Sequence, residues 1–244
     1  MIQNNYIKYL QELRQRLIRI VISLGILFLS LFLISERLYD ELAKPLLMHL
    51  PEGSRLIATA VTSTFTVPTK LAFMAALFLN MPYIFYELWS FVAPALYKKE
   101  KMHILALVCA SLIFFYIGTV FSYLILCPLA LAFFAKAAPK AVTIMTDISN
   151  YLDFVLRVIF AGGLAFQVPV ITFIAVEKQW LAVEDIKRVR PFVIVGAFTL
   201  GMLLTPPDVI SQILLALPMW SLFEVGVVVV HLYYKKTALQ KNIS

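Results

Sequence analysis

Long apolar runs separated by short polar segments make up most of the chain, and this pattern predicts membrane-spanning helices. Charge-free runs of 16 or more residues recur, whereas a soluble helix confines its apolar residues to one stripe. We expect an all-α integral membrane protein, a single polytopic domain over residues 1–244 with six transmembrane helices in a curved, cup-like bundle. The predicted spans are 20–34, 68–89, 103–134, 151–176, 191–204 and 209–230.

The polar segments between these spans predict the parts that lie outside the bilayer. Residues 4–19 have apolar and charged positions at helical spacing, which is typical of an amphipathic helix at the membrane surface, and this helix leads straight into the first span. The segment 35–67 forms the predicted outer loop, and 90–102 and 177–190 form cytoplasmic loops. The last two spans are short, because the 191–204 run reaches only about 21 Å against a hydrocarbon core of about 30 Å.

Composition and charge support this interpretation and orient it. The chain of 244 residues is 61% hydrophobic and 14% charged, with a mean hydropathy of +0.88, which is too apolar for a soluble core. Its net charge of +7 does not indicate nucleic acid, because the basic residues gather at the ends of apolar runs. Fourteen lysines and arginines fall on one predicted side and five on the other, so we expect both termini in the cytoplasm.

The sequence contains no motif that would anchor an enzyme. Nucleophile-elbow, zinc-protease, phosphate-loop and haem motifs do not occur, and the three histidines stand in separate segments. The two cysteines share one apolar run, without the spacing of a disulfide or a metal site. We therefore predict no catalysed reaction, no cofactor and no metal.

Two carboxylates stand among cations on the predicted cytoplasmic side, Glu12 and Glu100. Either could bind a cationic partner. Glu12 could instead pair with Arg16 at i, i+4, and Glu100 could neutralise a neighbouring lysine, with a surface pair contributing about 0–1 kcal/mol. Both interpretations remain open on the sequence alone.

Further candidate residues fall in span four and between the last two spans. Gln167 lies near the middle of span four, where its amide is satisfied by helices of the same chain or docks another subunit's helix. Pro169 leaves a backbone carbonyl nearby without its usual donor. Asp208 follows two prolines and precedes an apolar run, which suits a helix N-cap. Gln167, Pro169 and the glycines of span four also suggest an alternative function, an ion-coupled secondary transporter of small solutes.

Four segments together resemble the TatC family, the polytopic core of the twin-arginine protein translocase. They are YLQELRQRL, FVAPALYKKE, the F-Q-V-P of span four and VGAFTLGMLLTPPD, in that order along the chain. The resemblance implies a receptor that recognises twin-arginine signal peptides and, with TatA- and TatB-type single-span partners, exports folded proteins by using the proton gradient. It also implies the bacterial cytoplasmic (inner) membrane as its location.

The resemblance assigns roles by position. It implies a signal-peptide site made of Glu12, Glu100, Arg14, Phe91, Pro94, Lys98 and Lys99. It implies partner-binding or structural roles for Pro45, Gln167, Pro169, Thr205, Pro206 and Asp208. The chain departs from the family pattern at Gln167, where a glutamate is common, and at Tyr9, where a histidine is common. A hydrogen-bonding role for Gln167 survives the first change, whereas a charged one does not.

Overall fold

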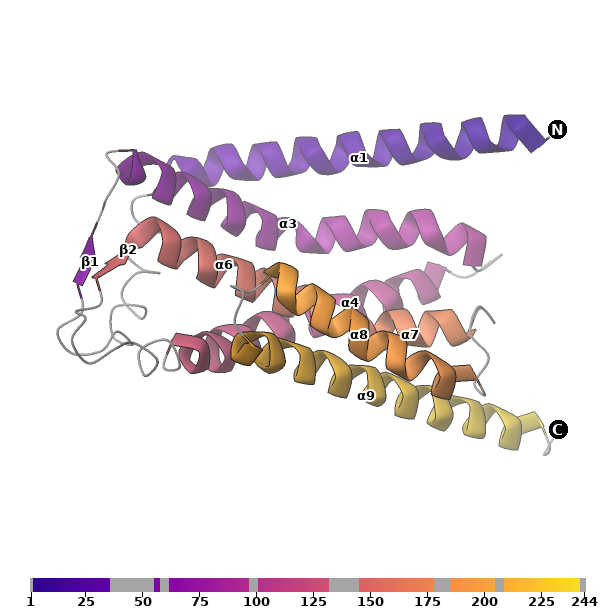
Figure 1. The fold of residues 1–244 in the computed structure, drawn as a ribbon. Coiled ribbons are helices and arrows are strands. Elements are labelled where there is room, and N and C mark those ends of the chain that lie inside the picture. Colours follow the sequence, from indigo (N-terminus) through magenta and orange to yellow (C-terminus); the bar gives the residue numbers. More distant parts are fainter. Residues whose placement is uncertain are drawn as a thin grey trace. The chain divides into compact units, whose positions relative to one another are not determined.

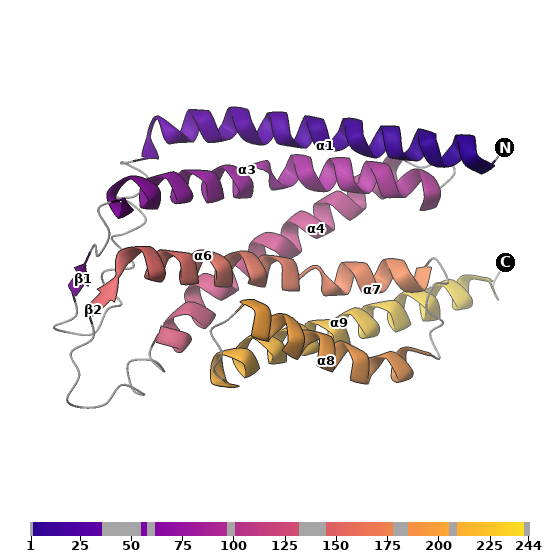
Figure 2. The same ribbon diagram turned by 45° about the horizontal axis from the view of Figure 1, so that its top comes forward.

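The structure is a computed structural model that describes residues 2–35, 55–57, 62–96, 101–131, 145–177, 185–204 and 209–241. Helices account for nearly all of these residues, which confirms the predicted fold class (Figures 1 and 2). The helices are α1 (Ile2–Phe32), α3 (Ser63–Leu96), α4 (Lys101–Phe121), the π-helical η1 (Ser122–Leu126), α6 (Ile148–Ala165), α7 (Val168–Glu177), α8 (Ile186–Leu204) and α9 (Val209–Lys241).

Four helical stretches of the described chain are long and apolar enough to cross a membrane: Ile7–Phe32, Phe65–Val92, Ile104–Leu131 and Ile148–Val176. The last two predicted spans lie in α8 and α9. Helix α8 has 19 residues, about 28 Å at 1.5 Å per residue, and begins with basic residues. Helix α9 has 33 residues, Val209–Lys241, and includes an apolar stretch at Ala216–Val228.

Two features differ from the sequence-based expectation. The amphipathic segment 4–19 is helical and continues into the first span, as predicted, but as part of α1, Ile2–Phe32, it packs beside α3 (Figure 2). Helical periodicity identifies an apolar face but does not say where a helix enters the bilayer. A short parallel pair, β1 (Arg55–Ile57) with β2 (Met145–Asp147), was not predicted, since three residues carry too little pattern.

The helices belong to two compact units, and the first comprises residues 1–112 and 138–153. In it α1 and α3 pack antiparallel. Near one end Phe28 contacts Phe73 with ring centroids 6.0 Å apart, and further along the Ser23 hydroxyl lies 3.0 Å from Asn80 Oδ1. Because Asn80 is buried, its side-chain amide needs a hydrogen-bond partner, and Ser23 supplies one. This hydrogen bond fixes the register of α1 against α3.

The second unit comprises residues 113–137 and 154–244. Here α4 and α6 approach closely at small residues, and a Cβ added to Gly118 would lie 2.6 Å from the backbone oxygen of Gly162. The π-helical turn η1 precedes Pro128, which has no N–H to offer the carbonyl four residues earlier. Helices α7 and α8 each pack against α9, with Phe223 and Val230 of α9 in the core.

The helix of predicted span four is interrupted between α6 and α7, at Phe166 and Gln167. Pro169 explains the break, because it cannot donate to the carbonyl of Ala165, where α6 ends. The backbone N–H of Ile171 then bonds to the carbonyl of Gln167 at 3.0 Å and restarts the helix. Span four is therefore two helices in sequence.

The close approach at Gly118 gives a test of packing in the second unit. Gly118→Ala should lower the free energy of unfolding by about 1–3 kcal/mol, because the backbone oxygen of Gly162 cannot move aside easily. Gly196→Ala in α8 is the matched control, since a Cβ there meets nothing within 4 Å. Thermal unfolding in detergent compares the two. A Gly118 variant as stable as the control would contradict the packing.

Candidate functional site

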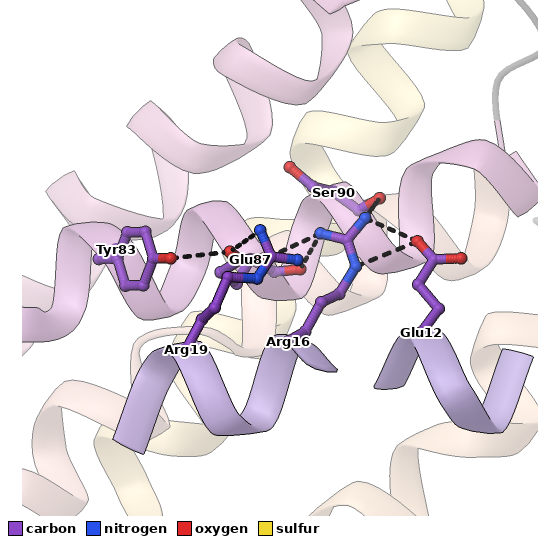
Figure 3. A network of polar contacts seen from close by, with 6 residues as sticks. All are labelled: Glu12, Arg16, Arg19, Tyr83, Glu87 and Ser90. Atoms are coloured by element: carbon purple, nitrogen blue, oxygen red, sulfur yellow. Dashed lines mark hydrogen bonds and ion pairs between the residues drawn. The ribbon is translucent and has the colours of Figure 1, made fainter. Parts of the chain in front are cut away.

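The carboxylate of Glu87 is the centre of a polar cluster between α1 and α3 (Figure 3). Its side chain is only 1% exposed. Arg16 Nη1 donates to Oε2 at 2.7 Å, and Arg19 Nη1 lies 2.9 Å from Oε1. The Tyr83 hydroxyl also donates to Oε1 at 2.9 Å. Both carboxylate oxygens are therefore bound, which is the condition under which a buried charge is tolerated.

Helical spacing explains how these side chains meet. Arg16 and Arg19 are three residues apart on α1, and Tyr83 and Glu87 are four apart on α3, so each pair shares a helix face. The register fixed at Ser23 and Asn80 then brings the two faces together. The cluster follows from two local periodicities and one interhelical register.

Arg16 links Glu87 to Glu12. Its Nε and Nη2 both donate to Glu12 Oε1, at 3.1 and 2.7 Å, while Nη1 bonds to Glu87 Oε2 (Figure 3). The Arg16 side chain is 15% exposed and that of Glu12 is 39% exposed. The i, i+4 pairing of Glu12 with Arg16, one of the two interpretations left open by the sequence, is therefore confirmed.

A backbone carbonyl completes the surroundings of Arg16, and a proline explains why it is available. Arg16 Nη2 donates to the carbonyl of Ser90 at 3.3 Å. In an α-helix that carbonyl would accept from the residue four positions later, which is Pro94, and proline has no N–H. Pro94 thus frees an acceptor for Arg16. The carbonyl of Glu87, 3.4 Å from Arg16 Nη1, adds a weaker contact.

The remaining predicted signal-peptide residues are placed differently. Arg14 is exposed on α1 and lines, with apolar residues of the same helix, a groove of 410 Å³. Phe91 is partly buried in α3 beside Ser90. Lys98, Lys99 and Glu100 lie outside the described residues. A juxtaposition of Glu12 with Glu100 therefore stays a prediction.

Of the predicted partner-binding or structural residues, the structure describes two. Gln167 and Pro169 lie at the α6–α7 break in the second unit, and both are buried. A Cβ added to Gly226 of α9 would lie 2.9 Å from the Cα of Pro169, so α7 and α9 approach closely there. The other predicted residues of this set fall beyond the described ranges: Pro45, Thr205, Pro206 and Asp208.

Glu87 and Arg19 were not predicted as members of this cluster. Glu87 falls two residues before the end of the predicted 68–89 span. The available signal was the spacing of basic residues three apart on one helix and of Tyr83 and Glu87 four apart on another. That signal identifies two faces, but only the register of α1 on α3 shows that they meet.

A polytopic helical membrane protein with an acidic and basic cluster between its first two long helices is the class that this fold and site define. The family model of the Sec-independent protein translocase protein (TatC) matches residues 8–218. The TatC protein of Azotobacter chroococcum mcd 1 is 47% identical over 221 residues, covering 91% of this chain and 87% of that protein. The TatC protein of Escherichia coli strain K12 is 45% identical over 230 residues, 94% of this chain and 89% of that one.

Solved structures show the same likeness. A crystal structure of the twin arginine translocase receptor TatC superposes with a TM-score of 0.82 and 31% identity, over 92% of this chain and 98% of that one. The chain belongs to the TatC family. The family resemblance stated from the sequence motifs is confirmed.

The burial of Glu87 predicts unequal costs for two ion pairs on α3. Glu87→Ala should lower the free energy of unfolding by about 3–5 kcal/mol, because it leaves Arg16 beside a buried gap. Asp153→Ala is the control. It removes the partner of Lys70, a pair in which the side chains are 30% and 45% exposed, and should cost about 0–1 kcal/mol.

Thermal unfolding of both variants in the same detergent measures the difference. Equal shifts of the two midpoints would contradict the assignment of Glu87 as the carboxylate on which the α1–α3 contact depends.

Proposed function

We propose that this chain is the receptor and core subunit of the Tat translocase, which recognises twin-arginine signal peptides and exports folded proteins across the membrane by using the proton gradient. Membership of the TatC family supports this function over a solute transporter. The observation that carries it is Glu12, a half-exposed carboxylate in a cluster that already binds a guanidinium with charge-assisted hydrogen bonds.

The chemistry of the cluster suits arginine rather than lysine. A guanidinium is planar and offers several N–H donors in a fixed fork, whereas an ammonium is a compact point charge. Arg16 uses this fork to reach two carboxylates and two backbone carbonyls at once. A signal-peptide arginine at Glu12 would use the same geometry, and a lysine could satisfy only part of it.

The loop after α3 supplies the second half of the proposed site. Glu100 is the second carboxylate for the arginine pair, and Lys98 and Lys99 repel cationic segments that do not satisfy both acids. Phe91 and Pro94 shape the end of α3 that leads into this loop. Arg14 lies on the same helix as Glu12 and contributes to the N-terminal part of the site.

The remaining assignments concern partners and location. The chain works with TatA- and TatB-type single-span subunits as a hetero-oligomer and catalyses no reaction itself. Residues with partner-binding or structural roles in this proposal are Pro45, Gln167, Pro169, Thr205, Pro206 and Asp208. The protein lies in the bacterial cytoplasmic (inner) membrane with both termini in the cytoplasm, as the distribution of lysine and arginine favours.

Site-directed photo-crosslinking tests the proposed function. A twin-arginine signal peptide with a photo-reactive residue beside its arginine pair should crosslink to the full-length chain in membranes that contain the assembled translocase. The yield should fall at least tenfold, about 1.4 kcal/mol, for a twin-lysine peptide and for the Glu100→Lys variant.

Asp153→Asn provides the control, because it neutralises an acid of the same unit that pairs with Lys70 instead of Arg16. Equal crosslinking of the twin-arginine and twin-lysine peptides would overturn the proposal.

A further inference from the structure

We propose that Arg16 occupies the site on Glu12 that an arginine of the signal peptide takes on binding. Glu87 is then the positioning residue that holds Arg16 once the peptide has displaced it from Glu12. The inference rests on the proposed function, since it requires Glu12 to receive an arginine. It adds a residue that the family resemblance does not assign, Glu87, and a direction in which an internal arginine moves.

The first observation is the state of Glu12. Both hydrogen bonds from Arg16 reach the same oxygen, Oε1. Figure 3 shows Glu12 Oε2 turned away from Arg16, and no donor from the described part of the chain bonds to it. A carboxylate with one oxygen committed binds an incoming guanidinium through one oxygen only. Full bidentate binding requires Arg16 to withdraw.

The second observation is that Arg16 keeps hydrogen-bond partners when it leaves Glu12. If it gives up Glu12, it keeps the Glu87 carboxylate at 2.7 Å and the carbonyls of Ser90 at 3.3 Å and Glu87 at 3.4 Å. The Ser90 carbonyl is available because Pro94 cannot bond to it. Arg16 therefore need not enter solvent or remain an unpaired cation when Glu12 is taken.

The third observation separates the roles of the two acids. Glu87 is 1% exposed and binds Arg16, Arg19 and Tyr83 through both of its oxygens. It has no room for a further guanidinium. Glu12 is 39% exposed and is held by Arg16 alone among the described residues. The exposed acid is the one that exchanges partners, and the buried acid anchors the arginine that is displaced.

This arrangement determines whether each of two substitutions raises or lowers the affinity for the signal peptide. Glu87→Gln keeps the shape and part of the hydrogen bonding but removes the charge, so the guanidinium of Arg16 concentrates on Glu12 and competes more strongly with the peptide. Arg16→Gln removes the competitor and leaves Glu87 with Arg19 and Tyr83. The two variants should therefore change peptide affinity in opposite directions.

The experiment is a titration of a photo-reactive twin-arginine signal peptide against membranes that contain the full-length chain in the assembled translocase. Glu87→Gln should weaken half-maximal crosslinking by about fivefold, about 1 kcal/mol, and Arg16→Gln should tighten it by about threefold. The double variant should behave like Arg16→Gln. Glu87 acts only by holding Arg16, so its charge has no effect on peptide binding once Arg16 is absent. Asp153→Asn is the matched neutralisation and should leave the curve unchanged.

The thermal midpoint of each variant shows whether it is folded, and the opposite signs distinguish positioning from a purely structural role. If Arg16→Gln weakens binding as Glu87→Gln does, or if Glu87→Gln has no effect, the inference is overturned. If the wild type does not prefer the twin-arginine peptide over the twin-lysine peptide, the proposed function fails and the inference fails with it. A wild type that prefers arginine while the variants behave alike overturns the inference only.

Discussion

A carboxylate that is almost completely buried between two helices requires cations within hydrogen-bond distance, and this requirement organises the first unit of the chain. Glu87 meets it with Arg16 and Arg19 from α1 and with a hydroxyl from its own helix. Because the cost of leaving such a charge unpaired is several kcal/mol, the contact tolerates little sliding of α1 along α3. The position of Arg16, and through it the availability of Glu12, depends on this one interaction.

The second unit is held together differently. Its helices approach through glycines, as at Gly118 and Gly162, and through an apolar core around Phe223. Prolines interrupt the helical hydrogen bonding in both units, with different results. Pro169 separates α6 from α7, whereas Pro94 frees a carbonyl within α3 that Arg16 then uses. A residue that usually only breaks helices thus becomes part of the proposed site.

Much of the fold was predictable, because membrane-spanning helices differ strongly in composition from the polar segments between them. The all-helical class and the apolar spans follow from hydropathy, and the Glu12–Arg16 pair follows from helical spacing. The four family motifs then indicated the function that is proposed for the chain. The packing of the N-terminal part of α1 against α3 was not predictable from periodicity, since an amphipathic face looks the same at a membrane surface as beside another helix.

The centre of the site was beyond prediction for a related reason. Glu87 falls near the end of a predicted span, and its burial depends on the register of α1 against α3, which no local pattern encodes. That register is fixed by pairs far apart in the sequence, such as Ser23 with Asn80. The proposed role of Glu100 stays a prediction from the motif, because that residue lies outside the described ranges.

In the proposed mechanism Glu12 exchanges Arg16 for an arginine of the signal peptide, whereas Glu87 stays bound to Arg16. An experimental structure of the assembled translocase with a bound twin-arginine signal peptide tests this most directly. The account predicts a peptide guanidinium on Glu12, with Arg16 withdrawn from Glu12 Oε1 and still within hydrogen-bond distance of Glu87 Oε2. A peptide bound with the Arg16–Glu12 pair intact at 2.7 Å, and with its arginines elsewhere, would contradict the account.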